Sequence, residues 1–258
     1  MDIGQITPLI LTFNESANIV RTLKPLHWAR QIVVLDSRST DDTTAIARSF
    51  PNVSIHERSF ETHTAQWNYG ISLVQTDWIL ALDADYVTNS EFTAELERLS
   101  ILPGTNAFFA RFIYCVCGRP LRASLYPPRA VLFRRENARY VPDGHTQLLQ
   151  FDGKAGDLNV SIRHDDRKPL AQWLQAQDGY ARLEVGKLAA GATGRRDSVR
   201  KWIFVAPLLT PLYCLFFKGL ILDGWAGLHY TFQRTLAEMI LSLRLIEQMR
   251  DKRPLKPS

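Results

Sequence analysis

The chain has 258 residues, of which 46% are hydrophobic and 22% charged, and this composition excludes a disordered or fibrous protein. Its length allows one large domain with a smaller appendage. The formal net charge of +5 favours an anionic partner, but it does not choose among a nucleotide, a nucleic acid and acidic lipid head groups.

Strands and helices are predicted to alternate through the N-terminal part of the chain. Short apolar stretches indicate strands at residues 7–13, 31–35, 53–56 and 78–82. Asn14, Glu15 and Ser16 suit a helix cap, and a helix is expected to follow them to about residue 26. Further helices are expected through Ile46 and Phe50, at 64–74 and at 90–99. This alternation predicts a mainly parallel sheet that helices cover on both faces.

The middle of the chain is predicted to add antiparallel strands to this sheet, at residues 107–116 and 130–133. Alternation along the first of them places Cys115 and Cys117 on one face, and we expect reduced, buried thiols. A polar loop at 140–147 is expected to precede a strand at 148–151. A helix at 173–188 and a flexible, basic linker at 191–196 follow.

The C-terminal section differs in composition from the rest. Residues 202–217 carry no charge, and Pro207 and Pro211 are predicted to interrupt any helix there. The run is short for a simple membrane span, which needs roughly 20 apolar residues. An amphipathic helix is predicted at about 230–249. Basic residues flank the section: Arg195, Arg196, Arg200 and Lys201 before it, and Arg250, Lys252, Arg253 and Lys256 at its end.

This pattern favours an element that lies in an anionic interface, or a re-entrant hairpin, over a full crossing. The alternative is a helical extension of the core or a dimer contact. The N-terminus shows no basic segment followed by an apolar run, so we expect no secretory signal and residence on the cytoplasmic side.

Acidic residues follow several predicted strands. Asp83 and Asp85 end an apolar strand and, two residues apart in an extended backbone, would face one site. Asp36 ends the second strand, and Asn14 and Glu15 follow the first. Ligands of open sheets bind at such strand ends, and paired carboxylates suit Mg²⁺ or Mn²⁺, which would hold a diphosphate.

In order and spacing, these motifs resemble the family 2 glycosyltransferases, which have the GT-A nucleotide-sugar fold. The resemblance covers nearly the whole chain, and its motifs lie at residues 9–15, 33–41, 66–71 and 82–85. Later segments, at 128–134, 152–154, 164–168 and 224–227, are similar to the branch that adds sugars to the lipopolysaccharide inner core. The implied fold is an α/β, mainly parallel, Rossmann-like sheet flanked by helices, with an apolar C-terminal helical appendage.

The resemblance also implies a domain organisation. Residues 1–190 would form the catalytic domain, with a nucleotide-sugar half at 1–100 and an acceptor half at 101–190. Residues 191–258 would form a membrane-associating helical region.

The resemblance assigns roles to individual residues. Asp36 would accept a hydrogen bond from the nucleobase, with Thr12, Asn14 and Glu15 in the same pocket. Asp83 would meet the ribose or the metal. The candidate ligands of the Mg²⁺ or Mn²⁺ ion are Asp85 and His164. The residues expected near the phosphates are Arg129 and Arg134, with Arg58 and Gln66 as further candidates.

The implied reaction is inversion at the anomeric carbon by a single displacement, which needs a general base for the acceptor hydroxyl. Asp143 is the candidate base. The related branch commonly has Glu directly after a His in this loop, whereas this chain has His145 followed by Thr146. His145 and Asp165 therefore remain alternatives.

We expect a metal-dependent enzyme at the cytoplasmic face of the inner membrane, acting on a lipid-linked glycan acceptor in lipopolysaccharide core or other envelope glycan synthesis. The alternatives are a polyprenyl-phosphate sugar synthase, whose phosphate acceptor needs no strong base, and a nucleotide-sugar-binding or nucleic-acid-binding module. Nucleic acid is disfavoured because no aromatic-basic recognition motif is present. The donor sugar, the nucleotide, the linkage and the oligomeric state are left open.

Overall fold

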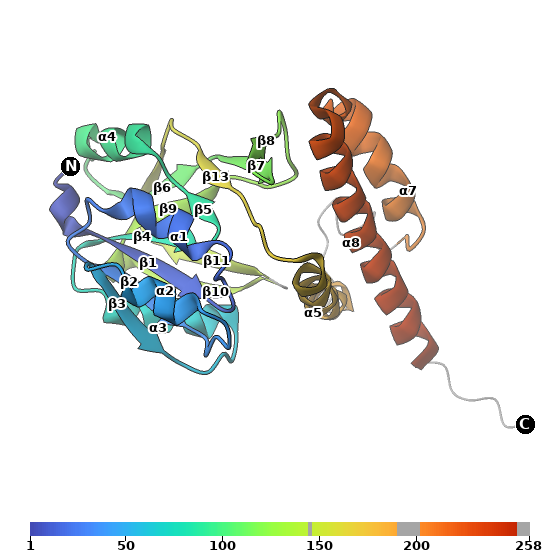
Figure 1. The fold of residues 1–258 in the computed structure, drawn as a ribbon, viewed down its shortest axis with the longest axis horizontal. Helices are drawn as coiled ribbons and strands as arrows, with labels where there is room; N and C mark the ends of the chain where they lie inside the picture. The colour runs from blue at the N-terminus through green and yellow to red at the C-terminus, as the bar shows by residue number, and fades with distance from the viewer. Residues whose placement is uncertain (144–145, 190–201, 252–258) are drawn as a thin grey trace, which may run out of the picture. The chain divides into compact units, whose positions relative to one another are not determined.

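The computed structural model describes residues 1–143, 146–189 and 202–251 (Figure 1). Contacts divide the chain into two compact units. The first unit consists of residues 1–120, 125–142 and 147–168, and the second contains the remainder. The predictions for His145, for the linker and basic residues at 191–201 and for the basic residues after 251 lie outside the described residues.

In the described part of the chain, seven strands form one large sheet in the order β12–β6–β9–β4–β1–β2–β3. They are β1 (Ile6–Thr12), β2 (Ile32–Asp36), β3 (Val53–Glu57), β4 (Trp78–Asp83), β6 (Thr105–Ala110), β9 (Arg129–Arg134) and β12 (Lys154–Asp157). β3, β2, β1 and β4 pair in parallel, whereas β9 pairs antiparallel with β4 and β6. The predicted α/β sheet is confirmed.

Helices of the first unit alternate with its strands along the chain (Figure 1). They are α1 (Ile19–Leu23), α2 (Thr43–Arg48), α3 (His63–Leu73) and α4 (Ser90–Arg98). Two of them start at side-chain caps, because Thr62 accepts the Ala65 N–H at 3.0 Å and Asn89 accepts the Phe92 N–H at 2.9 Å.

The core of the first unit has two layers, one on each face of the large sheet. Ile10 belongs to a cluster that includes Phe92 of α4. Its neighbour Leu9 points the other way, into a cluster with Trp67 of α3 and Phe133 of β9. Strands buried on both faces read as continuous apolar runs, which is why they were recognisable in the sequence.

The single strand predicted at 107–116 is wrong, because the segment divides between two sheets. β6 ends at Ala110, and β7 (Phe112–Val116) joins a small sheet in the order β5–β13–β7–β8. Its other strands are β5 (Tyr86–Val87), β8 (Arg119–Pro120) and β13 (Ile162–His164). At the break, the Arg111 carbonyl accepts the Ile162 N–H at 2.9 Å, which starts β13 beside β7.

The cysteine prediction is confirmed in part. Cys115, Cys117 and Cys214 are free, and Cys115 and Cys214 are buried. Cys117 is exposed, so the prediction that it shares the buried face of Cys115 is wrong. β7 ends at Val116 and Cys117 has a φ of 50°, so strand alternation has already stopped.

The loop predicted at 140–147 is also wrong. β10 (Ala138–Asp143) occupies its first part and pairs with β11 (Thr146–Phe151). Tyr140 packs the segment against the sheet. The centroid of its buried ring lies 5.2 Å from that of Trp67 and 6.0 Å from that of Phe133. Asn68 of α3 accepts the Tyr140 N–H at 2.8 Å and donates to its carbonyl at 3.0 Å.

The second unit is helical, as predicted for the C-terminal appendage. It contains α5 (Leu170–Ala189), α7 (Val205–Leu212), a π-helix (Tyr213–Phe217), a 3₁₀ helix (Leu220–Asp223) and α8 (Gly224–Asp251). α8 begins earlier than predicted, because Gly219 and Gly224 adopt positive φ and confine the turn to the residues around the 3₁₀ helix. Arg244 of α8 pairs with Asp178 of α5 at 2.5 Å. The functional boundary at residue 190 stays a prediction.

The prediction that Pro207 and Pro211 interrupt any helix is wrong. α7 begins at Val205, so Pro207 lies in the first turn, where a backbone N–H has no acceptor within the helix. Pro211 lies inside the helix, which then widens into the π-helix, where the Lys218 N–H donates to the Tyr213 carbonyl. Local π adjustments of this kind accommodate proline in a helix.

We expect Asn68→Ala to lower the free energy of unfolding by about 1–3 kcal/mol, because it leaves the Tyr140 N–H and carbonyl without partners. Denaturant unfolding measures the effect. Ser72→Ala is the control on the same helix, since the exposed Ser72 hydroxyl bonds only to the Tyr69 carbonyl. Equal stability of the two variants would contradict the role given to Asn68.

Candidate active site

Three strands of the large sheet end side by side. In the parallel registers, Thr12 at the end of β1 is the partner of Asp36 at the end of β2, and Leu11 is the partner of Asp83 at the end of β4. Crevices at the carboxyl ends of such strands are where open α/β sheets bind ligands. Thr12, Asp36 and Asp83 lie along this edge, and Asn14, Glu15 and Asp85 follow the strands that end there.

Asp36 is the centre of a hydrogen-bond network at the edge. Its carboxylate accepts the Thr12 hydroxyl at 2.8 Å, the Ser39 hydroxyl at 2.6 Å and the Ser39 N–H at 2.7 Å. The residue is only 1% exposed. A carboxylate has about four acceptor positions, so this one has capacity for one further donor, such as the N–H of a nucleobase.

The loop after β1 is held against the loop after β2. Asn14 has a φ of 54°, donates its N–H to the Ser39 hydroxyl at 2.8 Å and accepts the Thr40 N–H at 2.8 Å. The Glu15 N–H donates to the Thr43 hydroxyl at 2.7 Å. These bonds use the groups that were expected to cap a helix, so that prediction is wrong and α1 begins only at Ile19.

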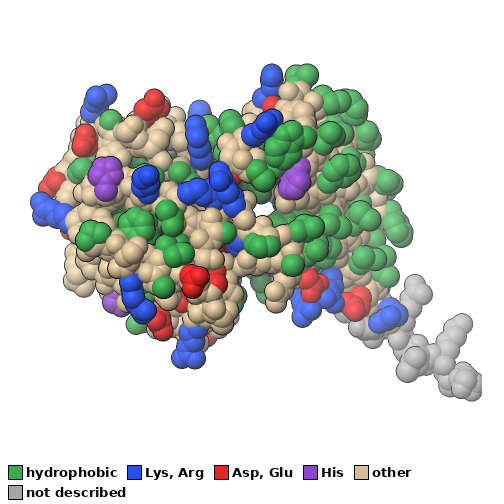
Figure 2. Space-filling view, in the orientation of Figure 1, with side chains coloured by type: hydrophobic (Ala, Val, Ile, Leu, Met, Phe, Trp, Pro, Cys, Tyr) green, Lys and Arg blue, Asp and Glu red, His purple; other side chains and the backbone are tan. Residues whose placement is uncertain are grey.

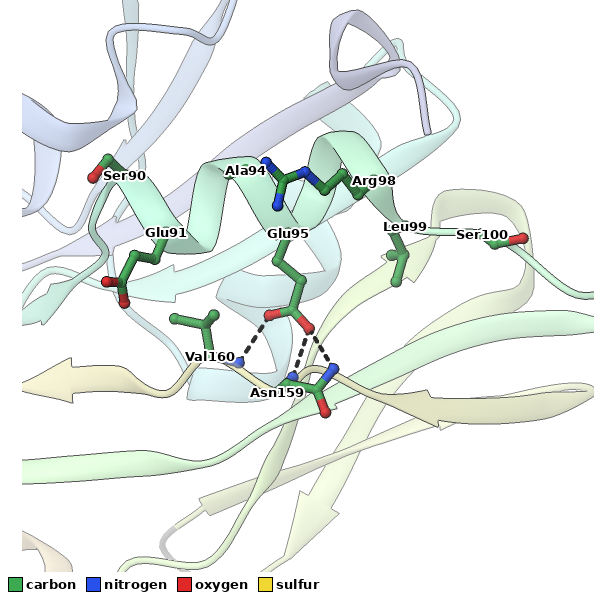
Figure 3. Close-up of a pocket in the computed structure, with 9 residues that line it drawn as sticks. All are labelled: Ser90, Glu91, Ala94, Glu95, Arg98, Leu99, Ser100, Asn159 and Val160. Carbon is green, nitrogen blue, oxygen red and sulfur yellow. Dashed lines mark hydrogen bonds between the residues drawn. The ribbon is translucent and has the colours of Figure 1, made fainter.

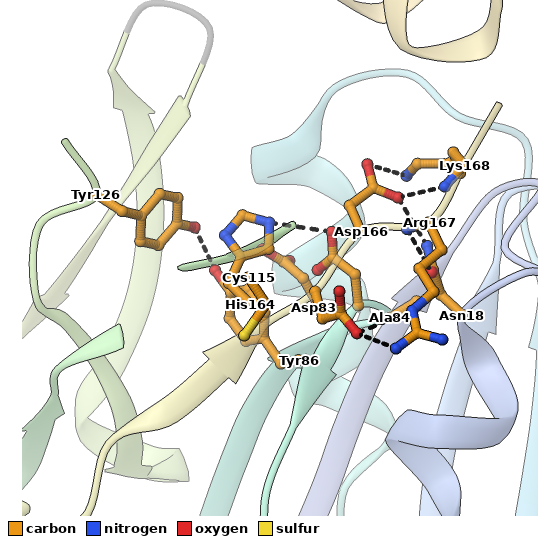
Figure 4. Close-up of polar contacts among 12 residues, drawn as sticks. Asn18, Asp83, Ala84, Tyr86, Cys115, Tyr126, His164, Asp166, Arg167 and Lys168 are labelled. Carbon is orange, nitrogen blue, oxygen red and sulfur yellow. Dashed lines mark hydrogen bonds and ion pairs between the residues drawn. The ribbon is translucent and has the colours of Figure 1, made fainter. Parts of the chain in front are cut away.

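Glu15 forms a buried ion pair with Lys168. The Lys168 Nζ lies 2.7 Å from Glu15 Oε1 and 3.7 Å from Asp166 Oδ2. Asn18 donates its amide to Glu15 at 2.8 Å and to Asp166 at 2.9 Å. The segment after β13 is thereby fastened to the loop after β1 (Figure 4).

Asp85 and His164 form a second polar pair at this edge. His164 Nε2 lies 3.2 Å from Asp85 Oδ2, and the side chains are 14% and 12% exposed, respectively. Tyr86, Tyr114 and Tyr126 surround the imidazole, with ring centroids 5.3, 4.7 and 4.8 Å away. Figure 4 shows Tyr126 and His164 on one side of the polar cluster and Lys168 on the other.

Burial and charge act in opposite directions on these groups. Burial raises the pKa of Asp85, but the charge and hydrogen bond of His164 and the charge of Lys168 outweigh it and lower the pKa to about 2. Burial lowers the pKa of His164, whereas the Asp85 carboxylate raises it above the ordinary value overall. Burial raises the pKa of Glu15 to about 7 against the opposing charge of Lys168.

Asp83 and Arg129 lie beside the pair formed by Asp85 and His164. Asp83 Oδ2 is 4.0 Å from Arg129 Nη1, and the Asp83 side chain is 39% exposed. The Arg129 guanidinium lies 4.8 Å from the centroid of the Tyr126 ring, and Tyr126 shares a hydrogen bond with Tyr86. A carboxylate and a stacked guanidinium are thus both available to a polar ligand.

Gln66 lies beneath the edge and not on it. It is 1% exposed, and its amide donates to the Ser37 hydroxyl at 2.9 Å and to the Arg58 carbonyl at 3.3 Å. The Arg58 side chain donates to the Ala65 carbonyl and pairs with Glu61. In this structure both residues hold the loops after β2 and β3. The Arg134 guanidinium lies 4.9 Å from the centroid of the Trp78 ring, at the amino end of β4. This is the end of the strand opposite to Asp83, so the prediction that Arg134 lies near the phosphates is wrong.

The candidate bases have different surroundings. Asp143 ends β10, and its carboxylate lies 2.9 Å from Lys187 Nζ of α5. His145 lies outside the described residues. The Asp165 carboxylate accepts the Gly118 N–H on one oxygen and pairs with Arg21 and Arg167 on the other. Asp165 is therefore engaged as a structural anion.

A shallow depression of about 830 Å³ lies elsewhere, along α4 (Figure 3). Glu95 crosses it and accepts the backbone N–H groups of Asn159 and Val160 at 2.7 and 2.8 Å. Its carboxylate is thereby satisfied within the protein. None of the residues predicted for the site lines this depression.

Comparisons with known proteins agree with this arrangement. The chain matches Glycosyl transferase family 2 over residues 9–144, more than half of its length. The chain belongs to glycosyl transferase family 2. The matched region contains the end of β1 and all of β2 and β4, with Asp36 and Asp83 at the ends of the latter two.

Relatives of this family member match it over shorter stretches. An uncharacterized glycosyltransferase of Rickettsia felis is 34% identical over 96 residues, which are 37% of this chain and 34% of that protein. The SPbeta prophage-derived glycosyltransferase SunS of Bacillus subtilis is 32% identical over 102 residues, 38% of this chain and 24% of that protein. The match therefore spans about a third or less of these relatives.

A solved structure shares the fold of this family 2 chain. It is a mannosyltransferase from Pyrobaculum calidifontis in complex with GDP-Man and Mn²⁺. The TM-score is 0.52 at 15% sequence identity, over 96% of this chain and 88% of that one. The predicted GT-A fold class and the predicted membership of family 2 are confirmed.

The chemistry of the family 2 site can be compared with the needs of a divalent cation. Within the described ranges, no group of three His, Cys, Asp or Glu side chains comes together as a metal site. Asp85 and His164 do lie together, and Asp85 Oδ1 and His164 Nδ1 are buried atoms without a hydrogen-bond partner. Buried polar atoms of this kind need a partner, and a carboxylate with an imidazole suits Mn²⁺.

The sequence analysis missed several residues of this family member's site. Lys168, Asn18 and Tyr126 contact predicted residues but were not among the candidates. Lys168 lies in the charged segment 164–168, from which only His164 and Asp165 were chosen. The excess of acidic residues at the strand ends was an available signal, because buried carboxylates require a cation nearby.

We expect Lys168→Met to lower the free energy of unfolding by about 3–5 kcal/mol, because it leaves the Glu15 carboxylate buried without its cation. Lys24→Met, at an exposed lysine, is the matched control and should have little effect. Adding Glu15→Gln to Lys168→Met should restore part of the loss in denaturant unfolding. A Lys168→Met variant as stable as Lys24→Met would show that the pair is not a stabilising contact.

Proposed function

We propose that this chain transfers a sugar from a nucleotide-diphosphate donor bound along the edge where β1, β2 and β4 end. The observation that carries the proposal is the register that brings Thr12 beside Asp36 and Leu11 beside Asp83, within a region that matches a glycosyltransferase family. A nucleotide sugar needs a nucleoside pocket and a diphosphate site next to each other. The two polar clusters at this edge are proposed to bind these two parts of the donor.

The nucleoside is proposed to bind at the Asp36 end of the edge. Asp36 has one acceptor position left for a base N–H, and Thr12 and Asn14 hold its surroundings through their bonds to Asp36 and Ser39. Asp83 is exposed enough to accept a ribose hydroxyl. Glu15 is proposed to position Lys168, whose ammonium adds positive charge on the side of Asp85.

A divalent cation, Mg²⁺ or Mn²⁺, is proposed to be held by Asp85 and His164, whose unpartnered buried atoms fit this role. When bound, such a cation neutralises charge on the diphosphate leaving group. The mannosyltransferase of similar fold holds GDP-Man and Mn²⁺, the classes of donor and cation named here. Arg129, held by Tyr126 near Asp83, is proposed to contact the phosphates.

The acceptor is proposed to be a lipid-linked glycan of the cell envelope, in lipopolysaccharide core synthesis, at the cytoplasmic face of the inner membrane. The sequence likeness of segments 128–134, 164–168 and 224–227 to the inner-core branch supports this substrate class. The exposed apolar side chains of the second unit support an acceptor that is embedded in lipid.

The proposed reaction is an inverting displacement. The acceptor hydroxyl oxygen forms a bond to the anomeric carbon while the bond from that carbon to the diphosphate oxygen breaks, and the nucleoside diphosphate leaves. The hydroxyl proton passes to a general base, for which Asp143 is proposed. Its side chain is 47% exposed and lies 2.9 Å from Lys187 Nζ.

We expect donor binding to depend on Asp85 and on a divalent cation. A screen of nucleotide sugars by thermal stabilisation, with and without Mn²⁺ or Mg²⁺, should identify one nucleotide that binds more tightly with the cation. Asp85→Asn should remove this cation-dependent increment, whereas Asp157→Asn, at an exposed carboxylate of β12, should keep it. Cation-dependent binding that survives in Asp85→Asn would refute the assignment.

We expect Asp143→Asn to slow transfer to a lipid A–core acceptor by at least about a hundredfold while donor binding is kept, because a general base contributes 10²–10⁴-fold. Lys187→Met breaks the same ion pair without removing the carboxylate and is the matched control. Near-normal turnover of Asp143→Asn would eliminate this base. Transfer to undecaprenyl phosphate in place of lipid A–core would overturn the acceptor class.

A further inference from the structure

The helices of the second unit expose many large apolar side chains. Phe217 is 78% exposed, Phe204 72%, Phe232 71% and Leu222 67%. Figure 2 shows hydrophobic side chains gathered over these helices. Scattered exposed apolar residues are ordinary on a soluble protein, but a contiguous face of this kind marks an interaction surface.

The exposed apolar residues of α8 form a stripe along one side of the helix. Trp225, Leu228, Phe232, Leu236, Met239 and Leu243 follow at intervals of three or four residues and are all exposed. The other side of the helix is occupied, since Leu241 packs with Ala181 and Val185 of α5, and Arg244 pairs with Asp178. The stripe is therefore not needed for packing within the unit.

The hydroxyl groups of the helix pair are satisfied internally. Thr210, Thr231 and Thr235 each donate to the carbonyl four residues earlier, at 2.7–2.8 Å, and Ser242 donates to the Ile203 carbonyl at 2.5 Å. These are all the serines and threonines between residues 202 and 251. Hydroxyl groups bonded back to helix carbonyls suit hydrocarbon, where no water is available to bond them.

The distribution of charge matches an anionic bilayer. Residues 202–217 carry no charged side chain, and Lys218 follows directly, with its Nζ 5.7 Å from the centroid of the Tyr213 ring. Trp202 and Trp225, both exposed, flank this apolar segment. Aromatic and basic residues at the ends of an apolar segment are typical of the membrane–water interface.

The shape of the helix pair decides between crossing a membrane and lying in it. Within the described residues, no single helix is long and apolar enough to cross. The segments Val205–Phe217 and Leu220–Arg250 meet these criteria only together, and they bend by 72° at Lys218 and Gly219. A pair bent this sharply presents one broad apolar face and not a straight span.

We propose that this helix pair inserts its apolar face into one leaflet of an anionic membrane, as a monotopic element. A second copy of the chain is the competing occupant, because the α8 stripe has the spacing of a coiled-coil seam. The lipid surface is favoured because the apolar face extends from α8 over Leu208, Leu212 and Phe216, far wider than a seam, and lacks flanking charges on α7.

Vesicle flotation of the full chain tests the proposal. The wild type should float with phosphatidylcholine vesicles that contain phosphatidylglycerol, and more weakly with phosphatidylcholine alone. Phe217→Ser/Leu222→Ser should lower the partition coefficient by at least about tenfold, because two apolar side chains no longer enter the leaflet. Leu102→Ser/Leu148→Ser, at exposed apolar residues of the first unit, is the matched control and should float like wild type.

The depth of insertion distinguishes a leaflet from a span. Lipids brominated near the head group should quench tryptophan fluorescence more than lipids brominated near the bilayer centre, and Trp202→Phe/Trp225→Phe should remove most of this quenching. Stronger quenching from the centre would overturn the monotopic arrangement. Absence of flotation, or a stable dimer in light scattering that Phe217→Ser/Leu222→Ser dissociates, would overturn the lipid surface as the occupant. Donor binding by the same variants is measured separately. Failure of the membrane proposal can therefore be distinguished from failure of the proposed glycosyl transfer.

Discussion

The parallel pairing of β1 with β2 and with β4 is the constraint on which the candidate site depends. These strands are buried on both faces, so a shift of one residue would exchange Leu9 and Ile10 between two different core layers. The register that the core selects also places Thr12 beside Asp36 and Leu11 beside Asp83. The packing of the apolar side chains in the core thus fixes the position of the polar side chains at the edge, although the core side chains do not themselves face the ligand site.

The site edge gathers buried carboxylates, and basic side chains from another part of the chain oppose the effect of burial on their pKa values. His164 and Lys168 come from β13 and the segment after it, and they pair with Asp85 and Glu15. The small sheet is what delivers them, because β13 is held between β5 and β7. Breaking β6 from β7 at Arg111 is therefore part of building the site, since a continuous strand would leave no place for β13 there.

The two units arrange their apolar and polar side chains in opposite ways. In the first unit, apolar side chains fill two layers around a sheet, and the polar groups that remain meet at one edge. In the second unit, the hydroxyl groups bond to carbonyls of the helix pair and much of the apolar surface faces outward. A soluble core would reverse the second arrangement, and this difference in packing is the physical basis for the proposal that the helix pair lies in lipid.

The sequence by itself determined the β-α-β order, the apolar strands and the carboxylates at their ends, because periodicity and the abrupt end of an apolar run are local properties. It also indicated the apolar C-terminal section. Only the tertiary structure decided the partners, such as Lys168 with Glu15, which are 153 residues apart. The packing of the Tyr140 ring against Trp67 likewise decided that a strand forms around Tyr140, where the local sequence favours a loop. The π-helix that follows Pro211 allows this proline to lie inside a helix, which local preference disfavours.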